Sequence, residues 1–168
     1  MSNSKYPLDA IDQKILSHLV HNARTPFLEI ARECGISGAA IHQRVKKLED
    51  LGIIVGSQFI VQPDSLGFNV CAFIGVRLTE VSLYSEVSFK LKQIPEVVEC
   101  HYVTGDFAVL LKIYCRDNNH LLVVLAEKIQ RIPGISDTNT FVSLDRAFER
   151  QVYIKDEESE TKKSKKSK

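Results

Sequence analysis

The hydrophobic periodicity of this chain changes at Gly67, and the change divides the sequence into two parts. Before Gly67, apolar residues recur every three or four positions in short segments, as they do along amphipathic helices. After Gly67, segments with strand character alternate with two helical segments. The 168 residues suffice for two small domains. We therefore expect two units of different architecture.

The first part carries start and stop signals for two short helices. One helix is predicted over about residues 9–22, with Asp9 as its N-cap and Asp12 in its first turn, where an acid suits the helix dipole. A second is predicted over about residues 26–34, because Thr25-Pro26 is a favourable N-cap followed by proline at the first helical position.

Gly35 marks the end of the second helix, and a third helix begins almost at once. Ser37 is a suitable N-cap, and Ile41, Val45 and Leu48 form one apolar stripe over about residues 37–51. Three short helices with a tight glycine-containing turn between the last two are typical of a helix-turn-helix domain. The helix after the turn, here the third, is the one that such domains place in the major groove of DNA.

The second part predicts an α+β fold with a ferredoxin-like βαββαβ unit, in which both helices cover one face of an antiparallel sheet. The Gly105-Asp106 pair is a hairpin signal between the two middle strands. Because the other face stays open and carries apolar residues, we expect a dimer. The predicted elements are strand 70–78, helix 83–94, strands 97–103 and 108–115, helix 121–132, strand 135–144 and an additional strand at 148–154.

These patterns predict four segments along the chain. They are a helix-turn-helix domain at 1–52, an extended linker at 53–67, a ferredoxin-like domain at 68–154 and a disordered charged tail at 155–168. No stretch reaches the roughly 20 apolar residues of a membrane helix, and the N-terminus lacks an apolar signal core. We therefore expect a cytoplasmic protein without a membrane partner.

The sequence gives no indication of catalysis, a cofactor or a metal site. The cysteines, Cys34, Cys71, Cys100 and Cys115, form no CxxC pair, and we interpret them as unlinked, mostly buried thiols. Although ferredoxin-like sheets also host enzymes, neither GxGxxG, GxxxxGK[ST], HExxH nor GxSxG is present. We expect no enzyme, no cofactor and no metal.

The face of the third helix opposite its apolar stripe has residue types that suit DNA. Small residues at its N-terminal end let a helix backbone approach the major groove, Gln43 can read adenine, and Arg44 can pair with guanine or phosphate. The chain as a whole has a net charge of only +1, so it lacks the overall basic character of many nucleic-acid-binding domains. Polar and basic residues opposite an apolar stripe also occur on any surface helix. The candidate DNA-binding residues are Ser37, Ala39, Ala40, His42, Gln43, Arg44, Lys46 and Lys47.

Motifs in both parts resemble the Lrp/AsnC family of transcriptional regulators, from about residue 8 to residue 154. The N-terminal resemblance rests on Ile36-Ser37, Arg44-Val45, Lys47-Leu48-Glu49 and Gly52-Ile53-Ile54. The C-terminal resemblance rests on Glu99-Cys100-His101, Gly105-Asp106-Phe107, Leu110-Leu111-Lys112, Pro133-Gly134-Ile135 and the segment 138–140.

The resemblance implies a dimer that assembles further, often to an octamer, and that binds pseudo-palindromic double-stranded DNA. It also implies a small-molecule effector, such as an amino acid, bound between dimers by Gly105, Asp106, Phe107, Ala108, Thr138 and Thr140. At Ala108 the family often has an acid, which would help to hold an amino group. Gly105-Asp106 is equally consistent with an ordinary hairpin turn. The alternative function is therefore an architectural DNA-binding protein that needs no effector.

Overall fold

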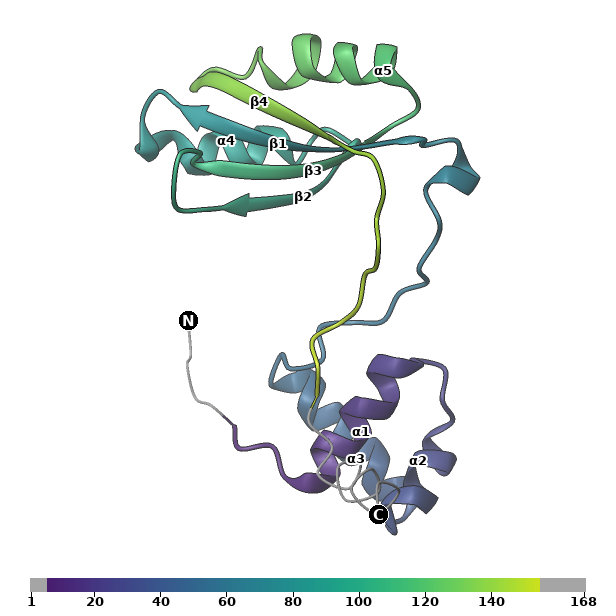
Figure 1. Ribbon diagram of the computed structural model, residues 1–168. Coiled ribbons are helices and arrows are strands. Elements are labelled where there is room, and N and C mark those ends of the chain that lie inside the picture. The colour runs from purple at the N-terminus through teal and green to yellow at the C-terminus, as the bar shows by residue number, and fades with distance from the viewer. Residues whose placement is uncertain (1–5, 155–168) are drawn as a thin grey trace, which may run out of the picture. The chain divides into compact units, whose positions relative to one another are not determined.

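The computed structural model describes residues 6–154, which divide into two compact units (Figure 1). The first unit contains the described residues up to Phe59 and those from Glu149 onward, and the second spans Ile60–Phe148. The charged tail predicted at 155–168 lies outside the described residues. Within residues 6–154, none of the helices has the length and apolar character that a bilayer crossing requires.

The first unit is a bundle of three short helices around one apolar core. The helices are α1 (Ala10–His21), α2 (Phe27–Cys34) and α3 (Gly38–Asp50). Ile154 packs against this core, and residues 148–154 form no strand, so the additional strand predicted there is wrong. The fully or almost fully buried side chains of the core are Ile15, Leu16, Ile30, Ala31, Ile41, Val45 and Leu48.

Local capping chemistry sets most of the helix ends. Asp9 caps α1 in a capping box with Asp12, and the Ser37 hydroxyl accepts a bond from the Ala40 amide at 3.2 Å, as predicted. Gly35 has a φ of 67°, and the Ile36 amide bonds back to the Ala31 carbonyl at 3.0 Å, which closes α2. Both predicted caps and the predicted turn are confirmed.

The cap predicted for α2 is wrong. Pro26 occupies the N-cap position with a φ of −60° and a ψ of 132°, and no side chain caps the helix. The Thr25 hydroxyl donates instead to the Asn22 carbonyl at 2.8 Å. The residue before a proline is biased away from helical geometry, and the turn after α1 offers Thr25 a nearer acceptor.

The second unit is a four-stranded antiparallel sheet with strand order β2-β3-β1-β4, the order of a ferredoxin-like fold. Alternate residues Ala72, Ile74 and Val76 of β1 are buried beneath both helical segments, so the helices cover one face of the sheet. Its elements are β1 (Val70–Leu78), α4 (Tyr84–Leu91), β2 (Val97–Tyr102), β3 (Val109–Cys115), α5 (Asn118–Val123) and β4 (Ile135–Ser143).

The opposite face of the sheet is open in the single chain. It presents Phe73 of β1 beside Phe141 of β4, and their side chains are 37% and 52% exposed. The α+β architecture and the open face agree with the fold predicted from the sequence. Among the cysteines, however, Cys115 is buried, Cys34 and Cys71 are half-buried, and Cys100 is exposed, so the prediction of mostly buried thiols is wrong.

The helix predicted at 121–132 begins three residues earlier. Asp117 caps it by accepting from the His120 amide at 2.7 Å, a local signal that the apolar periodicity did not include. From Val124 to Ile129 the helix continues with π-type hydrogen bonds.

A largely buried carboxylate, Glu96, ties this helix to the segment before β2. Its Oε1 accepts from Lys128 Nζ at 2.7 Å and contacts His120 Nε2 at 3.1 Å. Because His120 Nδ1 accepts from the Arg116 amide, Nε2 carries the proton. Burial raises the pKa of Glu96, but the bonds from Lys128, the backbone and His120 outweigh it, so the pKa lies below 4.5.

Glu96→Gln should therefore destabilise the second unit by about 1–2 kcal/mol at pH 7, because it removes a charge-assisted bond. The lowered pKa means that this stabilisation is present above about pH 4.5 and is lost as the pH falls through the folded-state pKa. Urea titrations at several pH values measure this. If the unchanged protein and Glu96→Gln lost stability in parallel between pH 7 and pH 3, Glu96 would not be the source of this pH dependence.

Candidate nucleic-acid interface and effector site

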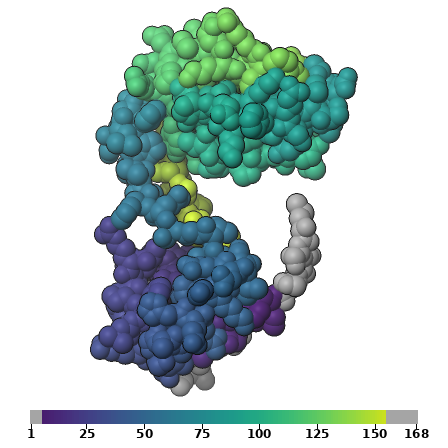
Figure 2. All heavy atoms as spheres, turned by 180° about the vertical axis from the view of Figure 1, so that it is seen from behind, coloured from purple at the N-terminus to yellow at the C-terminus, as the bar shows by residue number. Residues whose placement is uncertain are grey.

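Helix α3 presents two different faces. Ile41, Val45 and Leu48 are buried in the core of the first unit. The opposite side is exposed, and the atoms of the α3 segment, in blue, form part of the surface of this unit in Figure 2. The exposed residues among those predicted to bind DNA are Ser37, Ala39, His42, Gln43, Lys46 and Lys47, whereas Ala40 and Arg44 are half-buried.

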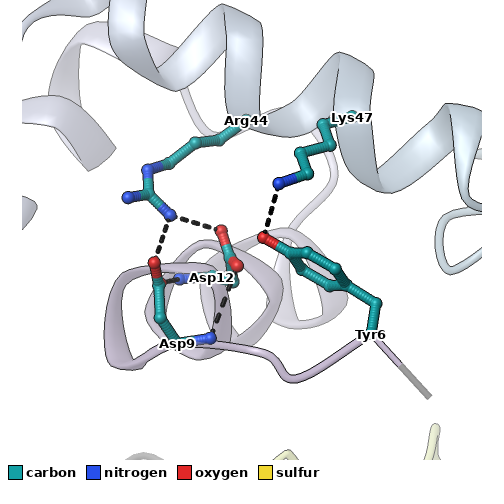
Figure 3. Close-up of polar contacts among 5 residues, drawn as sticks. All are labelled: Tyr6, Asp9, Asp12, Arg44 and Lys47. Atoms are coloured by element: carbon teal, nitrogen blue, oxygen red, sulfur yellow. Dashed lines mark hydrogen bonds and ion pairs between the residues drawn. The ribbon is translucent and has the colours of Figure 1, made fainter.

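Arg44 is held within the domain by two carboxylates from the start of α1 (Figure 3). Its Nη1 lies 2.7 Å from Asp9 Oδ2 and 2.7 Å from Asp12 Oδ1. The other oxygen of each carboxylate belongs to the capping box: the Asp12 amide donates to Asp9 Oδ1, and the Asp9 amide donates to Asp12 Oδ2. All four carboxylate oxygens therefore have partners, although Asp12 is only 2% exposed.

The electrostatics of this cluster differ from those of a free DNA-reading arginine. The bond from the Asp12 amide lowers the pKa of Asp9, burial opposes that effect, and the bond from Arg44 lowers it further. Both carboxylates lie beside the guanidinium, so its charge is more than balanced locally. A DNA phosphate approaching Arg44 would meet these acids as well.

Two other cationic or aromatic side chains of α3 also have partners in the first unit. Lys47 Nζ donates to the Tyr6 hydroxyl at 2.8 Å and lies 4.3 Å from the centre of the Tyr6 ring (Figure 3). The His42 ring meets Phe27 edge to face, with ring centres 4.7 Å apart. Ala39, Gln43 and Lys46 follow one another at helical spacing and form an exposed stripe of α3.

The turn predicted to hold an effector has the geometry of a tight hairpin. Gly105 has a φ of 108°, a conformation that L side chains rarely adopt. The Val103 amide donates to the Ala108 carbonyl, and the Ala108 amide donates to the Val76 carbonyl, both at 3.0 Å. The turn is thereby attached to the end of β1.

Arg77, near the end of β1, gathers the residues around this turn. Its Nε donates to the Asp106 carbonyl at 3.2 Å, and its guanidinium carbon lies 4.8 Å from the centre of the Phe107 ring. Its Nη1 lies 2.6 Å from Asp137 Oδ2, at the beginning of β4. The Phe107 ring packs directly on Gly75, where a Cβ atom would lie 2.6 Å from the ring.

The two predicted threonines lie on the other side of the sheet. Thr138 pairs with Val76 and Thr140 with Ile74, both buried beneath the helices, and paired residues share a face. The Thr138 hydroxyl accepts from Gln130 Nε2 at 2.8 Å. Within one chain, Arg77 contacts both the turn and Asp137, while the threonines face the helices.

Comparison with known proteins identifies the chain. Residues 8–49 match the model of the AsnC-type helix-turn-helix domain, and residues 71–153 match that of the Lrp/AsnC ligand binding domain. The regulatory protein AsnC of Haemophilus influenzae is 41% identical over 145 residues, which cover 86% of this chain and 97% of that protein. This chain belongs to the Lrp/AsnC family of transcriptional regulators.

Solved structures of Lrp/AsnC proteins share the fold of this chain. The structure of Escherichia coli AsnC has a TM-score of 0.83 and 38% identity, and the match covers 88% of this chain and 99% of that one. The transcriptional regulator NMB0573 of Neisseria meningitidis, solved as a complex with L-Met, has a TM-score of 0.80 and 26% identity, with 86% and 94% covered. The resemblance inferred from the sequence motifs is confirmed.

Sequence reasoning on this Lrp/AsnC chain missed residues whose partners lie far along the chain. Asp9 and Asp12 had a signal only as caps of α1, and their contact with Arg44 spans 35 and 32 positions. Arg77 and Asp137 had no motif at all, because their contact depends on the pairing of β1 with β4.

Proposed function

We propose that the exposed stripe of α3, centred on Gln43, contacts base pairs in the major groove of DNA. The observation that supports this is the capped α2–α3 turn, which leaves Ala39, Gln43 and Lys46 on the exposed side of a helix in an AsnC-type helix-turn-helix. A glutamine amide matches the donor and acceptor pattern of adenine in the major groove. Small Ala39 lets the backbone approach.

The basic and hydroxyl groups around this stripe supply phosphate contacts. Lys46 is exposed, and Ser37 lies at the positive N-terminal end of α3, where backbone amides can donate to a phosphate. Lys47, which donates to the Tyr6 hydroxyl in the free protein, donates to a phosphate instead when DNA is bound. His42 and Ala40 complete the predicted surface, and Arg44 holds the helix in place from within.

We propose to measure the binding of Gln43→Ala and Lys46→Ala to operator DNA and to mutated operator DNA. The measurement tests whether Gln43 reads a base pair and Lys46 contacts phosphate. Gln43→Ala should cost about 1–3 kcal/mol and relax the preference at one base pair. Lys46→Ala should weaken binding to every sequence and lower the salt slope by about one. Lys92→Ala, at an exposed lysine in the second unit, is the control. Unchanged affinity and preference in both α3 variants would overturn the proposal.

The second unit is proposed to bind an amino acid that modulates the regulator. Support comes from its match to the Lrp/AsnC ligand binding domain and from the Neisseria meningitidis regulator solved with L-Met. Titration with each of the twenty amino acids tests this, since a ligand at a hundredfold excess over its Kd adds about 2.7 kcal/mol of stability. If no amino acid raises the thermal midpoint, an architectural DNA-binding protein without an effector is the better assignment.

The open face of the sheet supports assembly into a dimer, and membership of the Lrp/AsnC family is the ground for proposing that dimers assemble further into an octamer. Phe73 and Phe141 are side by side on this face, and a second copy would cover them. A two-fold dimer presents two α3 helices to a pseudo-palindromic operator with half-sites about one helical turn, ~34 Å, apart or a multiple of it. The relatives are named as regulatory proteins, in agreement with a regulator rather than an enzyme.

A further inference from the structure

We propose that Tyr6 and Lys47 form a phosphate clamp at one edge of α3, in which the Tyr6 hydroxyl donates a hydrogen bond to the DNA phosphate that Lys47 binds. This inference rests on the proposed function, because it places one more contact on the same DNA. It adds a residue that lies before α1 and outside residues 8–49, the part that matches the helix-turn-helix model.

The segment before α1 lies along the second half of α3 (Figure 3). Asp9 Oδ2 lies 2.7 Å from Arg44 Nη1, and three residues earlier the Tyr6 hydroxyl lies 2.8 Å from Lys47 Nζ. Arg44 and Lys47 are also three positions apart, which is about one turn of a helix. Two contacts in matching steps therefore hold Tyr6 at this edge of α3.

This edge borders the stripe that we propose reads DNA. Gln43 and Lys47 are four positions apart, so they are neighbours on the surface of α3, and both are exposed. A recognition helix lies in the major groove between two phosphate backbones, and polar side chains along its edges contact phosphates. A group one turn from Gln43 is therefore placed to contact the backbone when Gln43 contacts a base.

The charge of Lys47 is available to a phosphate, in contrast to that of Arg44. Arg44 is paired with two carboxylates, whereas Lys47 contacts the hydroxyl and the ring face of one neutral side chain, Tyr6. The ring centre lies 4.3 Å from Lys47 Nζ, a cation–π contact that holds the ammonium group without neutralising it. Of these two cations, Lys47 is therefore the one that attracts a phosphate.

The Tyr6 hydroxyl has a hydrogen to donate. It accepts the bond from Lys47, so its own hydrogen takes no part in that contact. A DNA phosphate carries acceptor oxygens, and tyrosine hydroxyls are among the groups that donate to them. When Lys47 turns its donor to a phosphate, the hydroxyl beside it can donate to a second oxygen of the same phosphate. The aromatic ring remains a contact for the ammonium group.

Equilibrium binding of the full chain to DNA separates a direct contact from a positioning role. The probes are a duplex that the protein selects from random-sequence DNA and a scrambled duplex of the same length. Tyr6→Phe keeps the ring and should weaken binding to both duplexes by about fivefold or more, because a hydrogen bond to a charged oxygen is lost. The salt slope should stay unchanged, since a neutral hydroxyl releases no counterion.

Lys47→Gln is the companion variant. It should also weaken binding to both duplexes, but it should lower the salt slope by about one for each half-site. The double variant should lose less affinity than the product of the two single losses, because both residues bind one phosphate. A single neutral methylphosphonate at that phosphate should reduce the losses of Tyr6→Phe and Lys47→Gln together.

Tyr102→Phe is the matched control, because it removes the hydroxyl of another tyrosine, 54% exposed, in the second unit. It should bind both duplexes like the unchanged protein, and the thermal midpoint of Tyr6→Phe should also be unchanged. If Tyr6→Phe bound DNA like Tyr102→Phe, the inference would be wrong. A loss that came with a lower salt slope or a lower midpoint would also contradict it, because Tyr6 would then only position Lys47 or stabilise the fold.

Two further comparisons decide the remaining cases. If the losses of Tyr6→Phe and Lys47→Gln vanished at different phosphates, the two residues would not form one clamp. If Gln43→Ala and Lys46→Ala weakened DNA binding while Tyr6→Phe did not, the clamp would fail and the proposed function would stand. Unchanged binding by all four variants would overturn both.

Discussion

Replacing Arg44 with methionine is expected to destabilise the first unit by about 2–4 kcal/mol. Methionine keeps an apolar stem but leaves Asp12, which is 2% exposed, without its cation. Breaking one side of a buried ion pair costs about 3–5 kcal/mol, and the 30% exposure of the Arg44 side chain lowers that figure. Urea or thermal unfolding of the full chain, followed by circular dichroism, measures the loss.

The double variant Arg44→Met/Asp12→Asn separates a stranded charge from lost packing. It should recover about half of the lost stability, because the amide keeps the cap acceptor without a charge. Since Asn at position 12 leaves Asp9 as the remaining acid, the two variants form a thermodynamic cycle with Asp12→Asn alone. Lys46→Ala, an exposed change on the same helix, should alter stability by less than about 0.5 kcal/mol.

The pH dependence gives an independent check of the same cluster. The pKa of Asp9 is lowered in the folded protein, first by the bond from the Asp12 amide. The contribution of Asp9 to the free energy of unfolding is therefore fully present above the ordinary pKa of 3.8 and is lost as the pH falls through the lower folded-state value.

If Arg44→Met kept full stability and lost affinity at a single base pair, Arg44 would instead be a base-reading residue.

Replacing Gly75 with alanine is expected to disrupt the candidate effector site by displacing the Phe107 ring that packs on Gly75. The new Cβ would lie 2.6–2.7 Å from three atoms of the Phe107 ring, so the ring and its turn must move. Overpacking of this kind costs about 1–3 kcal/mol. We expect effector affinity to fall at least tenfold, measured by calorimetry, with DNA binding in the absence of effector unchanged.

Two variants define what Gly75→Ala does. Gly75→Ala/Phe107→Ala removes the clash and should restore most of the stability without restoring effector binding. Gly38→Ala introduces the same atom at a glycine with nothing within 4 Å, and should be neutral or slightly stabilising because helices favour alanine. Normal effector binding by Gly75→Ala would show that the position of Phe107 does not matter to the ligand.

Features that depend on near neighbours could be read from the sequence. The Asp9 and Ser37 caps and the Gly35 turn involve bonds between residues at most five positions apart, so residue types alone predict them. The predicted 70–78 strand matches β1 for the same reason, since its apolar run ends at recognisable turn residues. The start of α5 was missed because its signal, Asp117, precedes the apolar pattern.

Features that depend on distant neighbours required the tertiary structure. The exposed face of α3 follows from helical periodicity, but whether Arg44 faces DNA or Asp12 depends on how α1 packs against α3. The same holds for the effector site: the register of β1 with β4 places Arg77 beside Asp137 and turns Thr138 toward the helices. The sequence alone thus determined the caps of α1 and α3, most of the elements and the family. The partners of the charged side chains were decided by packing, because contacts across many residues leave no local pattern.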